Sequence, residues 1–135
     1  AMFGSETIIV AVSGGRDYTN EPRLNAVLGL IHKAVGIQLI IEGGCPAGDG
    51  GADERSRKWA KRNEVNCFSC PPKAKKYGWP AAGPRRNDEM GELKPCLWVL
   101  FPGGRGTESA REVAIARKIP RYEVTYGDED CIITG

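Results

Sequence analysis

The sequence predicts an α/β fold of the doubly wound type, in which helices cover both faces of a mainly parallel sheet. Short apolar, β-branched runs such as TIIVAVS (7–13) are typical of strands buried on both faces. Amphipathic runs alternate with them, and this alternation indicates parallel strands joined by right-handed crossovers. Glycine-rich stretches follow three of the strands, at the end where such sheets bind ligands.

Each element follows from its local pattern. Five strands are expected, at residues 7–13, 37–43, 65–70, 96–101 and 122–126, and residues 131–134 form either a short edge strand or a tail. The first two helices have inward faces made of Leu24, Val27, Leu28 and Ile31, and of Ala52, Ser56, Trp59 and Ala60. A short helix is expected over about 84–93, and the last helix has Ala110, Val113 and Ala114 inward and stops before Pro120.

Length and composition limit the classes of function that the chain can have. The 135 residues suit one domain, spanning 1–135, with 41% hydrophobic residues. Ala1, which precedes Met2, is expected to be a cloning remnant. A formal charge of +2 argues against nucleic acid or an anionic membrane as the partner. The sequence has no membrane-spanning run and no signal peptide, so we expect a cytoplasmic protein with five reduced cysteines.

Three glycine-rich loops, SGGRD, EGGCPAGDGGAD and PGGRGT, each follow a predicted strand. In a parallel sheet these loops meet at one edge, so we expect them to bind an anionic ligand, a nucleotide in particular. The binding residues expected from these loops are Ser13, Gly14, Gly15, Arg16, Gly43, Gly44, Asp53, Gly103, Gly104, Arg105, Gly106 and Thr107.

The loop PGGRGTES (102–109) allows two interpretations. Glycines before a helix let a phosphate approach free backbone N–H groups, with Thr107 and Arg105 adding donors. The alternative is a tight turn in which Thr107 is a simple N-cap. The order G-G-x-G is neither the dinucleotide fingerprint nor a P-loop, which disfavours a dinucleotide oxidoreductase or a kinase.

A second motif, GPRRNDEM (83–90), places Arg85 and Arg86 at the start of the short helix. Arginine suits bidentate recognition of phosphate, although a solvated charged turn is the alternative. Several carboxylates lie at or near the loops, namely Asp17, Glu42, Asp53 and Glu108. Each of these carboxylates is either a catalytic candidate, or an ordinary helix cap or solvated charge.

Other motifs give weaker signals. Cys67 and Cys70 have the spacing of a metal or redox pair, but a second such pair is missing and they are expected to be structural. With His32 as the single histidine and no serine elbow, a Ser-His-Asp hydrolase is excluded. The stretch KAKKYGWP (73–80) forms a lid, stacks on a base or is an ordinary exposed loop. We expect no metal and no cofactor.

Taken in order, the motifs VSGGRDYTN, IIEGG…GGADERSRKWA, WPAAGPRRNDEM and FPGGRGTESA resemble the YspA-like branch of the SLOG superfamily. The resemblance covers roughly residues 7–120 and implies a Rossmann-like fold that binds nucleotides or nucleotide-derived ligands. Such proteins are carried by bacterial and phage genomes.

The related LOG phosphoribohydrolases release the base from nucleoside 5′-monophosphates, and their signatures are R-K-x-x-M and P-G-G-x-G-T-x-E-E. Here Arg86 matches the functional arginine, and Asn87 replaces the lysine. Ser109 and Ala110 stand at the positions of the two glutamates. The resemblance implies an N-glycosidase in which Arg86 holds phosphate or base and Asn87 lies in the ligand site. Glu108 is its candidate catalytic carboxylate, with Asp53 or Glu42 as substitutes.

Two rival functions remain open. One is a sensor or sequestering module of the same fold for a nucleotide or an ADP-ribose-like ligand, which needs no placed carboxylate. The other is DNA binding, which the small charge disfavours. Relatives often pair, so a homodimer is also considered, with Trp59, Trp98 and the last helices as the subunit face.

Overall fold

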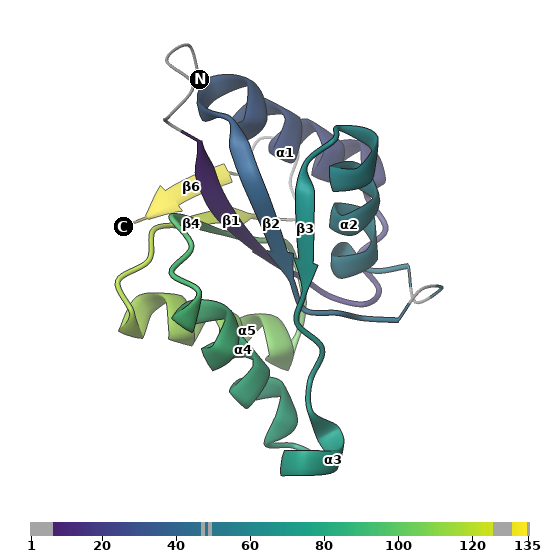
Figure 1. Ribbon diagram of the computed structural model, residues 1–135, viewed down its shortest axis with the longest axis vertical. Helices are drawn as coiled ribbons and strands as arrows, with labels where there is room; N and C mark the ends of the chain where they lie inside the picture. The colour runs from purple at the N-terminus through teal and green to yellow at the C-terminus, as the bar shows by residue number, and fades with distance from the viewer. Residues whose placement is uncertain (1–6, 47, 49, 126–130, 135) are drawn as a thin grey trace.

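The computed structural model describes residues 7–46, 48, 50–125 and 131–134, and it has a sheet between two layers of helices (Figure 1). Six strands form the sheet in the order β3-β2-β1-β4-β5-β6. They are β1 (Ile8–Ser13), β2 (Ile37–Glu42), β3 (Asn66–Ser69), β4 (Leu97–Leu100), β5 (Arg121–Val124) and β6 (Cys131–Thr134).

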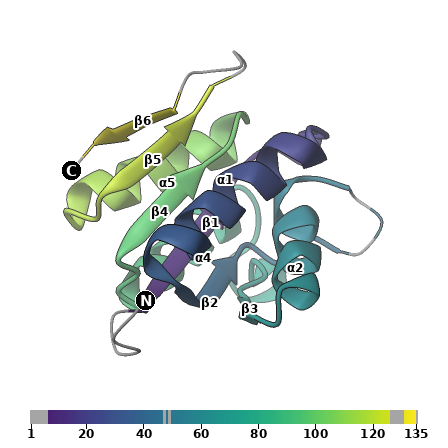
Figure 2. The ribbon, with the colours of Figure 1, turned by 90° about the horizontal axis from the view of Figure 1, so that it is seen from above.

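The first five strands are parallel, and β6 pairs antiparallel with β5 at one edge (Figure 2). The five parallel strands confirm the predicted doubly wound, Rossmann-like sheet. The sixth strand decides between the two alternatives for residues 131–134. The expected end of the fifth strand at Tyr126 lies outside the described residues.

Helices cover both faces of the sheet, as predicted. α1 (Glu21–Val35) and α2 (Ala52–Arg62) lie on one face, and α4 (Ala82–Glu92) and α5 (Arg105–Ala116) on the other (Figures 1 and 2). α4 begins two residues earlier than expected, and a short helix that the sequence did not predict, α3 (Ala74–Tyr77), precedes it.

The core has two parts because alternate residues of a strand point to opposite faces. One part packs Val10, Val12 and Ile40 of the sheet against α1 and α2, and includes Trp59. The other packs Ala11, Ile41 and Trp98 against α4 and α5.

This packing corrects the expectation for the two tryptophans. Trp59 and Trp98 are only 3% and 0% exposed, so they are core residues and cannot form a subunit face. The indole Nε1 of Trp98 donates a hydrogen bond to Ser13 Oγ at 3.0 Å, which satisfies its polar atom inside the core.

The strand order reverses at β1, which pairs with β2 on one side and β4 on the other. The connections after β1 and β4 lead to helices on opposite faces, and this divergence opens a crevice at the carboxyl ends of the strands. All three glycine loops follow strands that end there, so the fold brings them together as predicted. None of the helices in the described part of the chain is long and apolar enough to cross a membrane.

Candidate functional site

Backbone hydrogen bonds join the three glycine loops at the switch point. Gly15 N–H donates to Pro102 O at 2.9 Å, and Ala52 N–H donates to Gly15 O at 3.1 Å. The loop after β1 therefore lies between the start of α2 and the loop after β4. These contacts leave no room for a side chain at Gly15 or Gly103, where the loops approach most closely.

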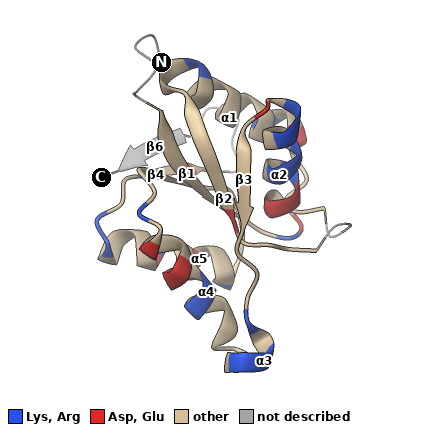
Figure 3. Ribbon diagram, viewed as in Figure 1, with Lys and Arg blue, Asp and Glu red and all other residues tan. Residues whose placement is uncertain are grey.

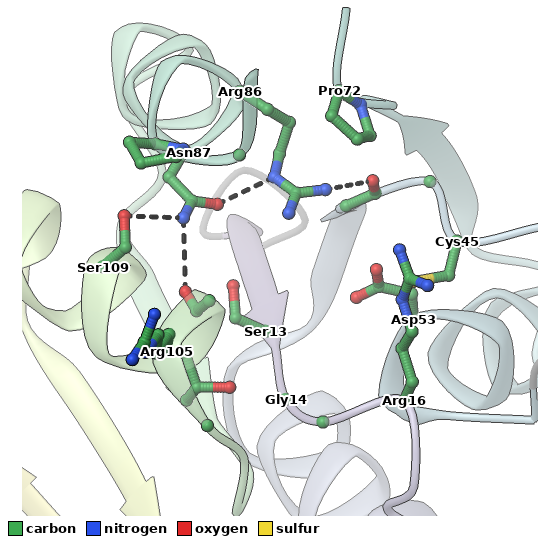
Figure 4. Close-up of a pocket in the computed structure, with 18 of the residues that line it drawn as sticks. Ser13, Gly14, Arg16, Cys45, Asp53, Pro72, Arg86, Asn87, Arg105 and Ser109 are labelled. Carbon is green, nitrogen blue, oxygen red and sulfur yellow. Dashed lines mark hydrogen bonds between the residues drawn. The ribbon is translucent and has the colours of Figure 1, made fainter. Parts of the chain in front are cut away.

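A cavity of about 690 Å³ opens above these loops (Figure 4). Of the residues expected to bind or act on the ligand, it is lined by Ser13, Gly14, Gly15, Arg16, Gly43, Gly44, Asp53, Arg86, Asn87, Gly104, Arg105, Gly106 and Thr107. Two expected residues, Gly103 and Glu108, do not line it.

The first turn of α5 forms part of the cavity wall. Its N-cap is Gly104, and no side chain caps the helix. Thr107 is therefore a residue of the first turn, only 4% exposed, and not the N-cap that the tight-turn interpretation required. Free N–H groups and a partial positive charge at this helix start can bind an anion.

Arg86 projects from α4 across the upper side of the cavity (Figure 4). Its Nη1 donates to Gly43 O, and its Nε donates to Asn87 Oδ1 at 2.9 Å. Arginine has five N–H donors, so these two bonds fix the guanidinium and leave donors for a ligand.

Asn87 holds α4 against α5 behind that guanidinium. It is 2% exposed, and its Nδ2 donates to Ser109 Oγ at 3.0 Å and to Gly106 O at 3.2 Å. Asn87 and Ser109 stand where the LOG enzymes have a lysine and a glutamate. A neutral hydrogen-bonded pair thus occupies the place of two charged residues.

Asp53 projects from α2 into the cavity, beside Arg16 and Cys45 (Figure 4). It is the second residue of α2 and 6% exposed, and the N-cap of that helix is Gly51. Burial, followed by the charge of Asp53, raises the pKa of Cys45 to about 11. Cys45 is therefore a neutral thiol near pH 7 and a poor nucleophile.

Gly43 separates Asp53 from Arg86. A Cβ at this position would lie 2.7 Å from Asp53 Oδ2 and 2.6 Å from Arg86 Nη1. Only a residue without a side chain lets both charged groups approach the same part of the cavity.

The cavity carries excess positive charge. Three arginines line it (Arg16, Arg86 and Arg105), and among its described lining residues Asp53 is the one carboxylate. Elsewhere, α2 has acidic residues in its first turn and basic residues in its last turn, and lysines gather at α3 (Figure 3). The local imbalance suits a phosphate or another anion.

The placement of Glu108 corrects the expectation that it serves the site. Its side chain is 60% exposed and ion-paired with Arg111, which also binds Glu123 Oε1 at 2.7 Å. Neighbouring residues of a helix point about 100° apart. Because Ser109 faces the cavity, Glu108 faces solvent.

Glu42 also does not line the cavity, and its contacts indicate a structural role. It is 0% exposed, and it accepts hydrogen bonds from Ser69, from Gly44 N–H at 2.6 Å and from Arg57 at 3.3 Å. Burial, as the largest cause, raises the pKa of this carboxyl. Glu42 fixes the loop after β2, which carries two of the cavity glycines.

Cys67 and Cys70 do not form a joint site. Cys67 packs on the α1/α2 side of the sheet and Cys70 on the α4/α5 side. Burial, as the largest cause, raises the pKa of both thiols, that of Cys67 to about 12. No group of three or more metal-ligating side chains occurs within the described ranges.

Glu54 holds the end of the second glycine loop against α2. Its Oε1 accepts from Gly48 N–H at 2.6 Å and Gly50 N–H at 3.1 Å, and its Oε2 lies 3.0 Å from Lys58 Nζ. The hydrogen bond from Gly50, followed by those from Lys58 and Gly48, lowers the pKa of Glu54 from 4.5 to about 2.

We expect Glu54→Gln to lower the free energy of unfolding near pH 7. As the pH is lowered, the free energy of unfolding of the variant should also fall less than that of the wild type. Glu54 binds a proton less readily in the folded state than in the unfolded chain. Its contribution to the free energy of unfolding is therefore complete above about pH 4.5 and is lost as the pH falls toward about 2. Urea unfolding of wild type, E54Q and the exposed control E112Q at pH 7, 4 and 3 measures this. A gap between wild type and E54Q that stays constant with pH would contradict it.

Sequence reasoning named no single residue of the apolar part of the cavity, although one alternative for the stretch 73–80, which contains Trp79 and Pro80, was stacking on a base. The additional lining residues are Cys45, Pro46, Pro71, Pro72, Trp79, Pro80, Gly83, Pro84 and Ser109. Four of them (Pro71, Pro72, Trp79 and Pro80) come from the proline-rich segment between β3 and α4, and Gly83 and Pro84 come from the first turn of α4. The composition of that segment was the available signal, but its position over the cavity depends on long-range packing.

The fold and this cavity define an α/β protein of the Rossmann-like class, with a cavity at the switch point of the sheet. The chain belongs to the YspA, cpYpsA-related SLOG family, whose family model matches residues 8–77. Membership indicates a nucleotide-related function. Comparisons with curated proteins and with solved structures gave no match.

Proposed function

We propose that the chain binds a nucleoside 5′-phosphate, or a related nucleotide-derived phosphate ester, in this cavity. The observation that carries the proposal is the convergence of the uncapped start of α5 with three arginines above the glycine loops. The phosphate would lie against the first turn of α5, near Gly104 and Gly106, within reach of Arg105. Membership in a nucleotide-related family supports the same ligand class.

Comparing AMP with adenosine tests the proposal. A ligand that binds only the folded state raises the melting temperature, so AMP should stabilise the protein and adenosine should do so far less. Inorganic phosphate should compete with AMP, and added salt should weaken binding. Equal stabilisation by AMP and adenosine would exclude a phosphate site.

Hydrolysis of the N-glycosidic bond is a second candidate, and the position of Asp53 in the cavity favours it. Water would add to C1′ of the ribose while the C1′–N bond breaks and its electron pair passes to the base. Asp53 would accept a proton from the water and stabilise the oxocarbenium-like transition state. Asp53 then passes this proton to the nitrogen of the departing base, so the products are the neutral free base and ribose 5-phosphate.

Asp53→Asn distinguishes hydrolysis from binding alone. If the chain is an N-glycosidase, D53N should stop base release from nucleoside monophosphates and still bind AMP, as measured by chromatography and calorimetry. If wild type binds AMP but releases no base, the chain is a sensor or sequestering module. The neutral Asn87–Ser109 pair, in place of two charged residues of the LOG enzymes, favours that outcome.

A further inference from the structure

The cavity has two chemically different sides. One consists of the glycine loops, the start of α5 and the arginines. The other is apolar and made by Pro71, Pro72, Trp79 and Pro80 of the segment before α4 and by Gly83 and Pro84 of the first turn of α4. Pro72 lies across the cavity from Gly14 (Figure 4).

Trp79 is the dominant apolar group on that side. It is 62% exposed although it lines the cavity, whereas Trp59 and Trp98 are buried. The indole rests on the first turn of α4, since a Cβ at Gly83 would lie 3.7 Å from Trp79 Cζ3. An indole that is supported on one side and open on another suits a flat ligand group.

From this division we infer that Trp79 stacks on the heteroaromatic base of the ligand whose phosphate lies at the start of α5. The inference rests on the proposed function and adds a base subsite to it. A nucleotide is charged at one end and flat and weakly polar at the other, which matches the two sides of the cavity. Stacking on an indole tolerates any base, so Trp79 strengthens binding without selecting among bases.

Binding of AMP and of ribose 5-phosphate to wild type, W79A, W79F and F68A tests the inference. Ribose 5-phosphate has the phosphate and the sugar but no base. W79A should bind AMP at least about 5-fold more weakly and ribose 5-phosphate with unchanged affinity. W79F should recover part of the loss because phenylalanine also stacks.

Phe68 supplies the matched control. It is 50% exposed on the edge strand β3 and does not line the cavity, so F68A removes an exposed aromatic ring elsewhere and should leave both affinities unchanged. Fluorescence gives a second readout because Trp79 is the exposed one of the three tryptophans. AMP should quench its emission, and ribose 5-phosphate should not.

The two proposals fail in different ways. If AMP and ribose 5-phosphate both bind, but W79A weakens neither or weakens both alike, base stacking is overturned and the phosphate site stands. If neither ligand binds wild type, the proposed function is overturned together with this inference. Weakening of AMP alone, with recovery in W79F, supports Trp79 as the base platform.

Discussion

Gly103→Ala should destabilise the protein by about 2–3 kcal/mol, because overpacking at a closed site forces the backbone to shift. A Cβ at Gly103 would lie 2.1 Å from Thr107 Oγ1, 3.0 Å from Thr107 Cβ and 2.7 Å from Gly15 N. Gly15 N–H is bonded to Pro102 O, so the methyl group would separate two of the three glycine loops. Gly103 therefore acts outside the cavity, by letting the loops that form it touch. Urea unfolding at neutral pH measures the loss.

Gly106→Ala is the matched control in the same loop. Gly106 lies in the first turn of α5, and a Cβ there would have no neighbour within 4 Å. G106A should leave the free energy of unfolding unchanged or raise it by up to about 1 kcal/mol, since alanine loses less conformational freedom than glycine in a helix. Equal stability of G103A and G106A would show that the loops do not need this close approach.

Local patterns predicted most of the fold. Strands buried on both faces form continuous apolar runs, and the inward face of α1, for example, was readable from Leu24, Val27, Leu28 and Ile31. The meeting of the glycine loops followed from topology alone, because parallel strands end at the same edge. Twelve of the thirteen expected binding residues line the cavity, and the thirteenth, Gly103, lies against two of them, Gly15 and Thr107.

The errors arose where orientation or long-range packing decides the outcome. The motif placed Glu108 at the start of α5 but did not fix the rotation of the helix, which turns Ser109 inward. Trp59 and Trp98 were considered for a subunit face, yet both are buried in the core, Trp59 on the α1/α2 side of the sheet and Trp98 on the α4/α5 side. The apolar side of the cavity depends on how the segment between β3 and α4 crosses the ends of the strands, which no short motif encodes.

Arg86→Gln should weaken binding of AMP by about 100-fold, which corresponds to about 2.7 kcal/mol. Hydrogen bonds between charged groups contribute about 1.5–3 kcal/mol each, and glutamine keeps a polar side chain but neither the charge nor the planar fork. The guanidinium is held in place by Gly43 O and Asn87 Oδ1, so little ordering is required when the ligand binds. Calorimetric titration of each variant with AMP gives the affinity.

Arg85→Gln removes the same charge from the neighbouring position of α4 and serves as the control. Arg85 is exposed, with its guanidinium carbon 5.0 Å from the centre of the Tyr77 ring, and it does not line the cavity. Salt screens exposed charges beyond about 8 Å at physiological ionic strength, so R85Q should change the affinity by about threefold at most. Arg86→Lys should fall between wild type and R86Q, because it keeps the charge without the fork. If R85Q and R86Q weaken binding equally, the cavity attracts its ligand by general charge, and the specific role of Arg86 is wrong.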